Sequence, residues 1–177
     1  MRIAITGTHK VGKTSLFESL SETLRGYDFI EEPYYQLAEA GYEFSDNPSY
    51  EEYLVMLEHS LKQLSTSGDN VVFDRCPLDY LAYLRVSGGS VRSAIHSAYS
   101  RVRDALTEID LLVFVPIEEP DLINCRDSDL PELRLKVNHA LEELIRDFML
   151  DTDFNIAIVS GSITERCEQV LNKVEVR

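Results

Sequence analysis

The sequence has few cysteines, and their spacing argues against two common kinds of small domain. Cys76, Cys125 and Cys167 are odd in number and far apart, and no C-x-x-C pair occurs. Neither a disulfide framework nor a cysteine zinc site is therefore indicated. Free cysteines of this kind favour a reducing compartment, so we expect a cytoplasmic protein.

Positive charge is also scarce. Against 31 Asp and Glu residues the chain has 17 Lys and Arg, which gives a formal net charge of −14. Such a surface repels nucleic acid and anionic membranes, so neither is expected as a partner. Four arginines, Arg85, Arg92, Arg101 and Arg103, nevertheless form a basic island. They either help to neutralise a substrate or balance the acidic surface.

Long apolar and low-complexity segments are missing as well. No apolar run reaches 18 residues, the amino terminus has no signal-like hydrophobic region, and no repeat is present. We therefore expect a protein that is neither exported nor membrane-spanning. With 44% hydrophobic and 27% charged residues, the composition is that of a soluble globular domain. One domain over residues 1–177 is predicted.

Short apolar runs alternate with helical periodicity along the chain. The pattern predicts strands at 2–6, 27–30, 70–73, 111–115 and 156–159, and helices at 12–24, 33–40, 49–66, 77–84, 91–107, 131–150 and after residue 162. The runs at 111–115 and 156–159 are wholly apolar, as in central parallel strands. The prediction is an α/β fold with three layers: a five-stranded parallel sheet, helices on both faces, and a short lid at about 118–131.

The segment GTHKVGKT matches the phosphate-loop pattern G-x-x-x-x-G-K-[ST] and lies between a predicted strand and a predicted helix. Its glycines allow backbone N–H groups to turn towards phosphate oxygens, and the helix amino terminus adds positive potential. Lys13 is expected at the β- and γ-phosphates and Thr14 at Mg²⁺. The predicted nucleotide-binding residues here are Gly7, Thr8, His9, Lys10, Val11, Gly12, Lys13, Thr14 and Ser15.

Two other strands end in acidic residues, at the edge where parallel strands place ligands. Glu31 and Glu32 follow the second strand, and a carboxylate there can orient a substrate hydroxyl and accept its proton. Side chains alternate along a strand, so only one of the two can face the phosphate loop. Asp74 ends the third strand as a Walker B acid would, and it is predicted to hold magnesium with Arg75 beside it.

These segments resemble the P-loop kinase superfamily, especially the deoxynucleoside-kinase and ribosylnicotinamide-kinase-like group, some of whose members are classed as AAA-type ATPases. The likeness rests on the phosphate loop, on Glu32-Pro33 and on the segment 74–80. The resemblance implies Glu32 as the base, and Arg126 and Arg134 as lid arginines that contact the phosphates. It also implies that the turn at Gly161 contacts the purine. Residues 172–175 read NKVE and depart from a guanine-reading motif, so ATP is preferred over GTP.

The sequence thus predicts a phosphotransferase that uses ATP and magnesium to phosphorylate a hydroxyl of a small nucleoside-like acceptor. Its expected catalytic residues are Lys13, Glu32, Arg75 and Arg126. A nucleoside monophosphate kinase is a close alternative, because the arginine island could hold a substrate phosphate. A nucleotide-hydrolysing regulatory switch is another, and a homodimer stays open.

Overall fold

A computed structural model describes residues 1–88, 92–121, 123, 125–151 and 155–175. Its strands are β1 (Arg2–Thr6), β2 (Asp28–Ile30), β3 (Val71–Asp74), β4 (Leu111–Phe114) and β5 (Asn155–Ile158). Its helices are α1 (Lys13–Thr23), α2 (Pro33–Glu39), α3 (Tyr50–Thr66), α4 (Pro77–Val86), α5 (Arg92–Leu106), α6 (Pro131–Asp151) and α7 (Ile163–Glu175), with a short 3-10 helix η1 (Asp127–Asp129).

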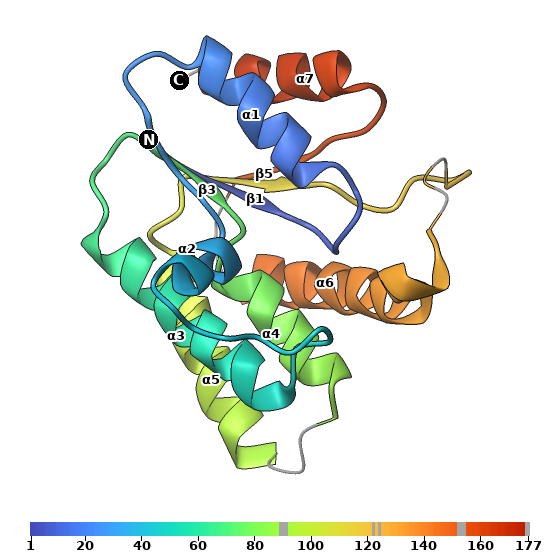
Figure 1. Ribbon diagram of the computed structural model, residues 1–177. Coiled ribbons are helices and arrows are strands. Elements are labelled where there is room, and N and C mark those ends of the chain that lie inside the picture. Colours follow the sequence, from blue (N-terminus) through green and yellow to red (C-terminus); the bar gives the residue numbers. More distant parts are fainter. Residues whose placement is uncertain (89–91, 122, 124, 152–154, 176–177) are drawn as a thin grey trace.

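The described strands form one parallel sheet in the order β2-β3-β1-β4-β5. Alternate residues of a strand enter two separate hydrophobic clusters. In β1, for example, Ile3 and Ile5 pack with α1 and α7, whereas Ala4 packs with α3, α4 and α6. Figure 1 shows the resulting layers, with α1 and α7 on one face of the sheet and the other helices on the opposite face. The predicted three-layer α/β fold is confirmed.

One detail of the predicted topology is wrong. The apolar run at 156–159 indicated a central strand, but β5 lies at the edge of the sheet and pairs only with β4 among the described strands. Ile158 is 64% exposed, whereas β4 is buried throughout. An apolar run therefore marked a half-covered edge strand here, because periodicity cannot reveal neighbours in the sheet.

Local chemistry explains where several helices begin. The Ser49 side chain accepts a hydrogen bond from the Glu52 N–H, and the Glu52 carboxylate accepts one from the Ser49 N–H, so α3 starts with a full capping box. Helices α2 and α4 each begin with a proline, which suits a first helical position. The predicted helix 91–107 is α5, although residue 91 lies outside the described residues. Among the described residues, the helices are too short or too polar to span a bilayer.

Because all described strands run parallel, their carboxyl ends meet at one edge of the sheet. The loops after β1, β2 and β3 carry the phosphate-loop motif, Glu32 and Arg75, respectively. Three segments that are far apart in the sequence thus come together.

Candidate active site

The phosphate loop, residues Gly7–Thr14, connects β1 to α1. Gly7 has φ +154°, and a Cβ at this position would lie 2.4 Å from the carbonyl oxygen of Val115. Gly12 has φ +87°, which L side chains rarely adopt. Both glycines of the motif are therefore required by backbone geometry as well as by any ligand.

Lys13 is the first residue of α1 and is only 5% exposed. Its Nζ donates to the Thr8 carbonyl oxygen over 2.7 Å. Burial, followed by the charge of Arg75, lowers the pKa of Lys13 to about 8. A buried ammonium bonded to a neutral carbonyl gains free energy when an anion approaches. The geometry therefore suits the predicted contact with nucleotide phosphates.

Arg134, in the first turns of α6, binds two carbonyl groups of the phosphate loop. Its Nε donates to the His9 oxygen over 3.2 Å, and its Nη2 donates to the Lys10 oxygen over 3.1 Å. The same guanidinium forms an ion pair with Asp121 and lowers the pKa of that carboxyl. Arg134 is 3% exposed, so here it supports the loop from behind rather than projecting from a lid.

Arg166 in α7 supports the loop in the same way, although the sequence did not single it out. Its Nη1 donates to the Val11 oxygen over 2.6 Å, and its Nη2 pairs with Glu118 over 2.9 Å. Glu118 also accepts a hydrogen bond from the N–H of Gly161, the predicted purine contact. No local motif surrounds Arg166, so only the tertiary fold reveals its role.

Thr14 and Asp74 form the candidate magnesium site. The Thr14 hydroxyl donates to Asp74 Oδ2 over 3.2 Å. Asp74 is 4% exposed, burial raises its pKa, and its Oδ1 is buried without a hydrogen-bond partner among the described residues. Hard oxygen ligands and an unsatisfied carboxylate oxygen fit Mg²⁺. The described residues hold no cluster of three or more His, Cys, Asp or Glu able to bind a metal, so phosphates and water would complete the shell.

Arg75 directly follows β3 and has φ +73°, an uncommon left-handed conformation for arginine. This turn directs its side chain to the site, where Nε forms an ion pair with Glu32 and Nη1 donates to the Gly7 oxygen over 3.1 Å. Burial acts to lower the pKa of Arg75, but Glu32, Tyr83, Asp79 and Tyr80 together outweigh it, and the pKa is raised. Arg75 thus stays charged and orients the carboxylate of Glu32.

Asp79 in α4 is a further site residue, known from the sequence only as part of the 74–80 segment. It is fully buried, and its Oδ1 accepts hydrogen bonds from the Gly7 N–H at 3.0 Å and from Arg75 at 3.3 Å. Its Oδ2 accepts from the Cys76 N–H at 3.0 Å and caps α4. One carboxylate thus connects the phosphate loop, the Arg75 turn and the start of α4.

Replacing Asp79 with alanine is expected to lower the free energy of unfolding by about 3 kcal/mol, because two buried N–H groups lose their partner and the buried Arg75 loses one of its two paired carboxylates. Urea denaturation followed by circular dichroism measures the change. Asp69→Ala, in an exposed turn, is the control and should stay within about 0.5 kcal/mol of wild type. A loss below about 1 kcal/mol for Asp79→Ala would contradict this role.

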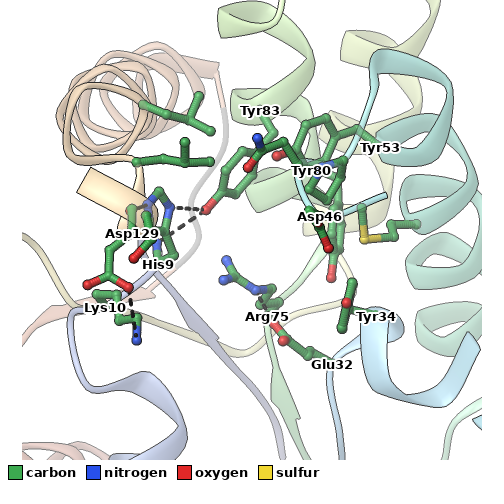
Figure 2. A pocket seen from close by; sticks show the side chains of 16 residues that line it. His9, Lys10, Glu32, Tyr34, Asp46, Tyr53, Arg75, Tyr80, Tyr83 and Asp129 are labelled. Atoms are coloured by element: carbon green, nitrogen blue, oxygen red, sulfur yellow. Dashed lines mark hydrogen bonds and ion pairs between the residues drawn. The ribbon is translucent and has the colours of Figure 1, made fainter. Parts of the chain in front are cut away.

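A cavity of about 250 Å³ opens beside these residues. Figure 2 shows its lining, in which His9 and Lys10 of the phosphate loop lie across from Glu32 and Arg75. Glu31 is not among the lining residues, and its exposed side chain follows the end of β2. Tyrosines and carboxylates make up much of the wall: Tyr34, Tyr53, Tyr80, Tyr83, Glu32, Asp46 and Asp129.

The His9 ring connects two walls of this cavity. Its Nε2 lies 2.8 Å from the Asp129 carbonyl oxygen and its Nδ1 lies 2.9 Å from the Tyr83 hydroxyl. Since a carbonyl only accepts, Nε2 carries the proton and Nδ1 accepts from Tyr83. Burial lowers the pKa of His9, which favours this neutral form. The sequence placed His9 among the residues of the phosphate loop, and the structure shows that its ring is engaged as well.

The other predicted arginines lie away from the cavity lining. Arg126 is exposed, and its backbone N–H donates to the Asp129 carboxylate over 2.9 Å. In the basic island, the described side chains pair with surface carboxylates: Arg85 with Glu143, Arg101 with Glu58, and Arg103 with Asp104. The structure does not describe the side chain of Arg92. These pairs favour the interpretation that the island balances surface charge.

Solved structures share this fold. Deoxyadenosine kinase from M. mycoides, with products dCMP and dCDP, superposes with a TM-score of 0.69 at 21% identity over 99% of both chains. A NadR protein in complex with NR superposes with a TM-score of 0.71 at 18% identity, and the match covers 99% of this chain and 50% of that one. The YorR protein from Bacillus subtilis, in complex with phosphorylated GDP, superposes with a TM-score of 0.58 at 16% identity, over 99% of this chain and 96% of that one. At these identities the likeness concerns the fold.

Among curated proteins, no sequence matches this chain significantly. A family model described as an AAA domain matches residues 2–166 and includes the phosphate loop. The resemblance to P-loop proteins, predicted from the motif, is confirmed by this match and by the fold. Because this family model matches most of the length of the chain, the chain belongs to the AAA domain family.

Proposed function

We propose that the protein is a kinase that transfers the γ-phosphoryl group of ATP to a hydroxyl of a small nucleoside-like acceptor. The observation that carries this proposal is the cavity of about 250 Å³ between the phosphate loop and Glu32. Direct phosphoryl transfer requires that the phosphate donor and the carboxylate that activates the acceptor lie on opposite sides of one small cavity. The similarity of the fold to that of a deoxyadenosine kinase supports the same proposal.

In this proposal the phosphate-loop N–H groups and Lys13 bind the β- and γ-phosphates. Glu32 orients the acceptor hydroxyl and accepts its proton, while Arg75 holds the carboxylate in place. Magnesium, held by Thr14 and Asp74, would neutralise phosphate charge when bound. Arg134 shapes the loop, and the turn at Gly161 lies beside the base of ATP.

Arg126 belongs to the proposed lid, residues 118–131. It is exposed and lies outside the cavity lining, so a role at the transition state requires this segment to close over the phosphates. Closure would add a positive charge where negative charge spreads during transfer.

The charges around the cavity favour a neutral acceptor over a nucleotide. Lys10 and Arg75 are the Lys and Arg residues that line it among the described residues, and both are already paired with carboxylates. Glu32, Asp46 and Asp129 add negative charge to the lining. A substrate phosphate would meet these carboxylates, so we place a nucleoside kinase ahead of a nucleoside monophosphate kinase.

The test is a phosphotransfer screen with radiolabelled Mg-ATP against four ribonucleosides, four deoxyribonucleosides and the matching monophosphates. We expect label transfer to at least one nucleoside, and transfer to monophosphates at least about tenfold slower. ATP hydrolysis without any labelled acceptor would instead favour the regulatory switch. Faster labelling of the monophosphates would favour the nucleotide kinase.

A further inference from the structure

One polar group in the cavity wall has no role in the contacts described so far. Tyr80, in α4, is 2% exposed and lines the cavity. Its hydroxyl is buried and has no hydrogen-bond partner among the described residues. Figure 2 shows the side chain among those that line the cavity.

An unsatisfied buried hydroxyl is costly. Leaving such a group without a partner costs roughly 1–3 kcal/mol, and most buried hydroxyls in proteins are therefore bonded. Phenylalanine would fill the same space at no such cost. A tyrosine that faces a substrate-sized cavity regains this free energy when a ligand supplies the missing partner.

The surroundings of Tyr80 define what that partner can be. Burial raises the pKa of its phenol, and the next cause is the negative charge of Glu32, which lies at the reacting end of the cavity. Arg75 acts in the opposite direction, and Asp79 and Asp74 again raise the pKa. Because Arg75 is already paired with Glu32 and Asp79, a phosphate or carboxylate on the ligand would meet the remaining negative charge and be repelled. A neutral oxygen close to the reacting hydroxyl is the group that fits.

We infer that the Tyr80 hydroxyl is a specificity determinant that hydrogen-bonds a second, neutral hydroxyl of the acceptor, next to the one that Glu32 activates. The acceptor is then a polyol or sugar-bearing compound rather than a simple alcohol. This inference rests on the proposed kinase function and adds one residue to it. Tyr80 acts in binding and does not take part in proton transfer.

The experiment compares wild type with Tyr80→Phe on one base carrying four sugars: adenosine, 2′-deoxyadenosine, 3′-deoxyadenosine and 2′,3′-dideoxyadenosine, or the same series on whichever base the screen selects. For wild type, removing one particular sugar hydroxyl should lower kcat/KM about tenfold to a hundredfold. For Tyr80→Phe, kcat/KM for acceptors that carry this hydroxyl should fall by the same factor, mainly because KM rises. For acceptors that lack it, kcat/KM should change less than about threefold, because removing the sugar hydroxyl and removing the Tyr80 hydroxyl abolish the same interaction.

Stability provides a readout independent of catalysis. Tyr80→Phe should keep or raise the thermal unfolding midpoint of the ligand-free protein, because no bond is lost. Tyr50→Phe is the matched control: its hydroxyl is also buried and unpaired among the described residues, but Tyr50 is not in the cavity lining. That variant should leave the sugar preference unchanged.

The outcomes are distinguishable. If wild type labels no acceptor, the kinase proposal fails and this inference fails with it. If wild type labels acceptors but Tyr80→Phe loses the same factor on all four sugars, or on none, the inference alone is overturned. A clear drop in the unfolding midpoint of Tyr80→Phe would also overturn it, because the hydroxyl would then have an internal partner.

Discussion

Replacing Lys13 with methionine is expected to weaken Mg-ATP binding by about a hundredfold or more, which corresponds to roughly 3 kcal/mol. The ammonium is buried beside the loop backbone, so its interaction with phosphate is poorly screened by solvent. Methionine keeps the apolar length of the side chain and removes the charge. Isothermal titration calorimetry with Mg-ATP measures the effect.

The same variant should remain folded. The folded state lowers the pKa of Lys13 from 10.5 to about 8, so burying the charged form costs stability below pH 8, and this cost fades as the pH rises towards 10.5. At pH 7 the methionine variant should therefore unfold at the same temperature as wild type or higher. Lys136→Met, on an exposed part of α6, is the control for binding. Mg-ATP affinity within about threefold of wild type for Lys13→Met would rule out phosphate binding by this loop.

Replacing Glu32 with glutamine should reduce phosphoryl transfer by about a hundredfold to ten-thousandfold, while Mg-ATP affinity stays nearly unchanged. Glutamine keeps the size and can still accept a hydrogen bond from Arg75, but it cannot accept the proton of the acceptor. Initial rates with the best acceptor from the screen give kcat, and calorimetry gives the affinity for ATP.

Glu31→Gln is the matched control, one residue earlier and exposed. It should retain transfer within about twofold of wild type, as expected of a surface substitution. Loss of transfer in Glu31→Gln with normal rates in Glu32→Gln would reverse the assignment of the base. Unchanged ATP hydrolysis in Glu32→Gln, with no transfer in either protein, would favour the switch.

Much of the fold was predictable because it depends on local periodicity. The strand at 111–115 and the helix from Pro131 followed from apolar spacing, and the helix predicted at 49–66 matches α3 to within one residue at its start. The order of strands in the sheet was harder to predict from the sequence. Pairing is decided by packing across the whole domain, which explains why the edge position of β5 was missed.

The candidate site divides in the same way. The phosphate loop carries its chemistry in consecutive residues, so its motif could be identified from the sequence. The contacts of Tyr80, Asp79 and Arg166 depend on how α4 and α7 are rotated against the sheet, and no linear pattern encodes that rotation. The functional roles of the predicted residues stay predictions, for which the variants above are the test.

The arginines that bind carbonyl groups of the phosphate loop determine when, during synthesis, the chain can form its phosphate-binding site. Carbonyl groups near residue 10 are fixed by Arg134 and Arg166, which the ribosome adds more than a hundred residues later. The motif is therefore complete early, but the side chains that fix its backbone are added much later. A nascent chain that has not yet reached Arg134 thus contains the phosphate-binding sequence without the side chains that hold its backbone in shape.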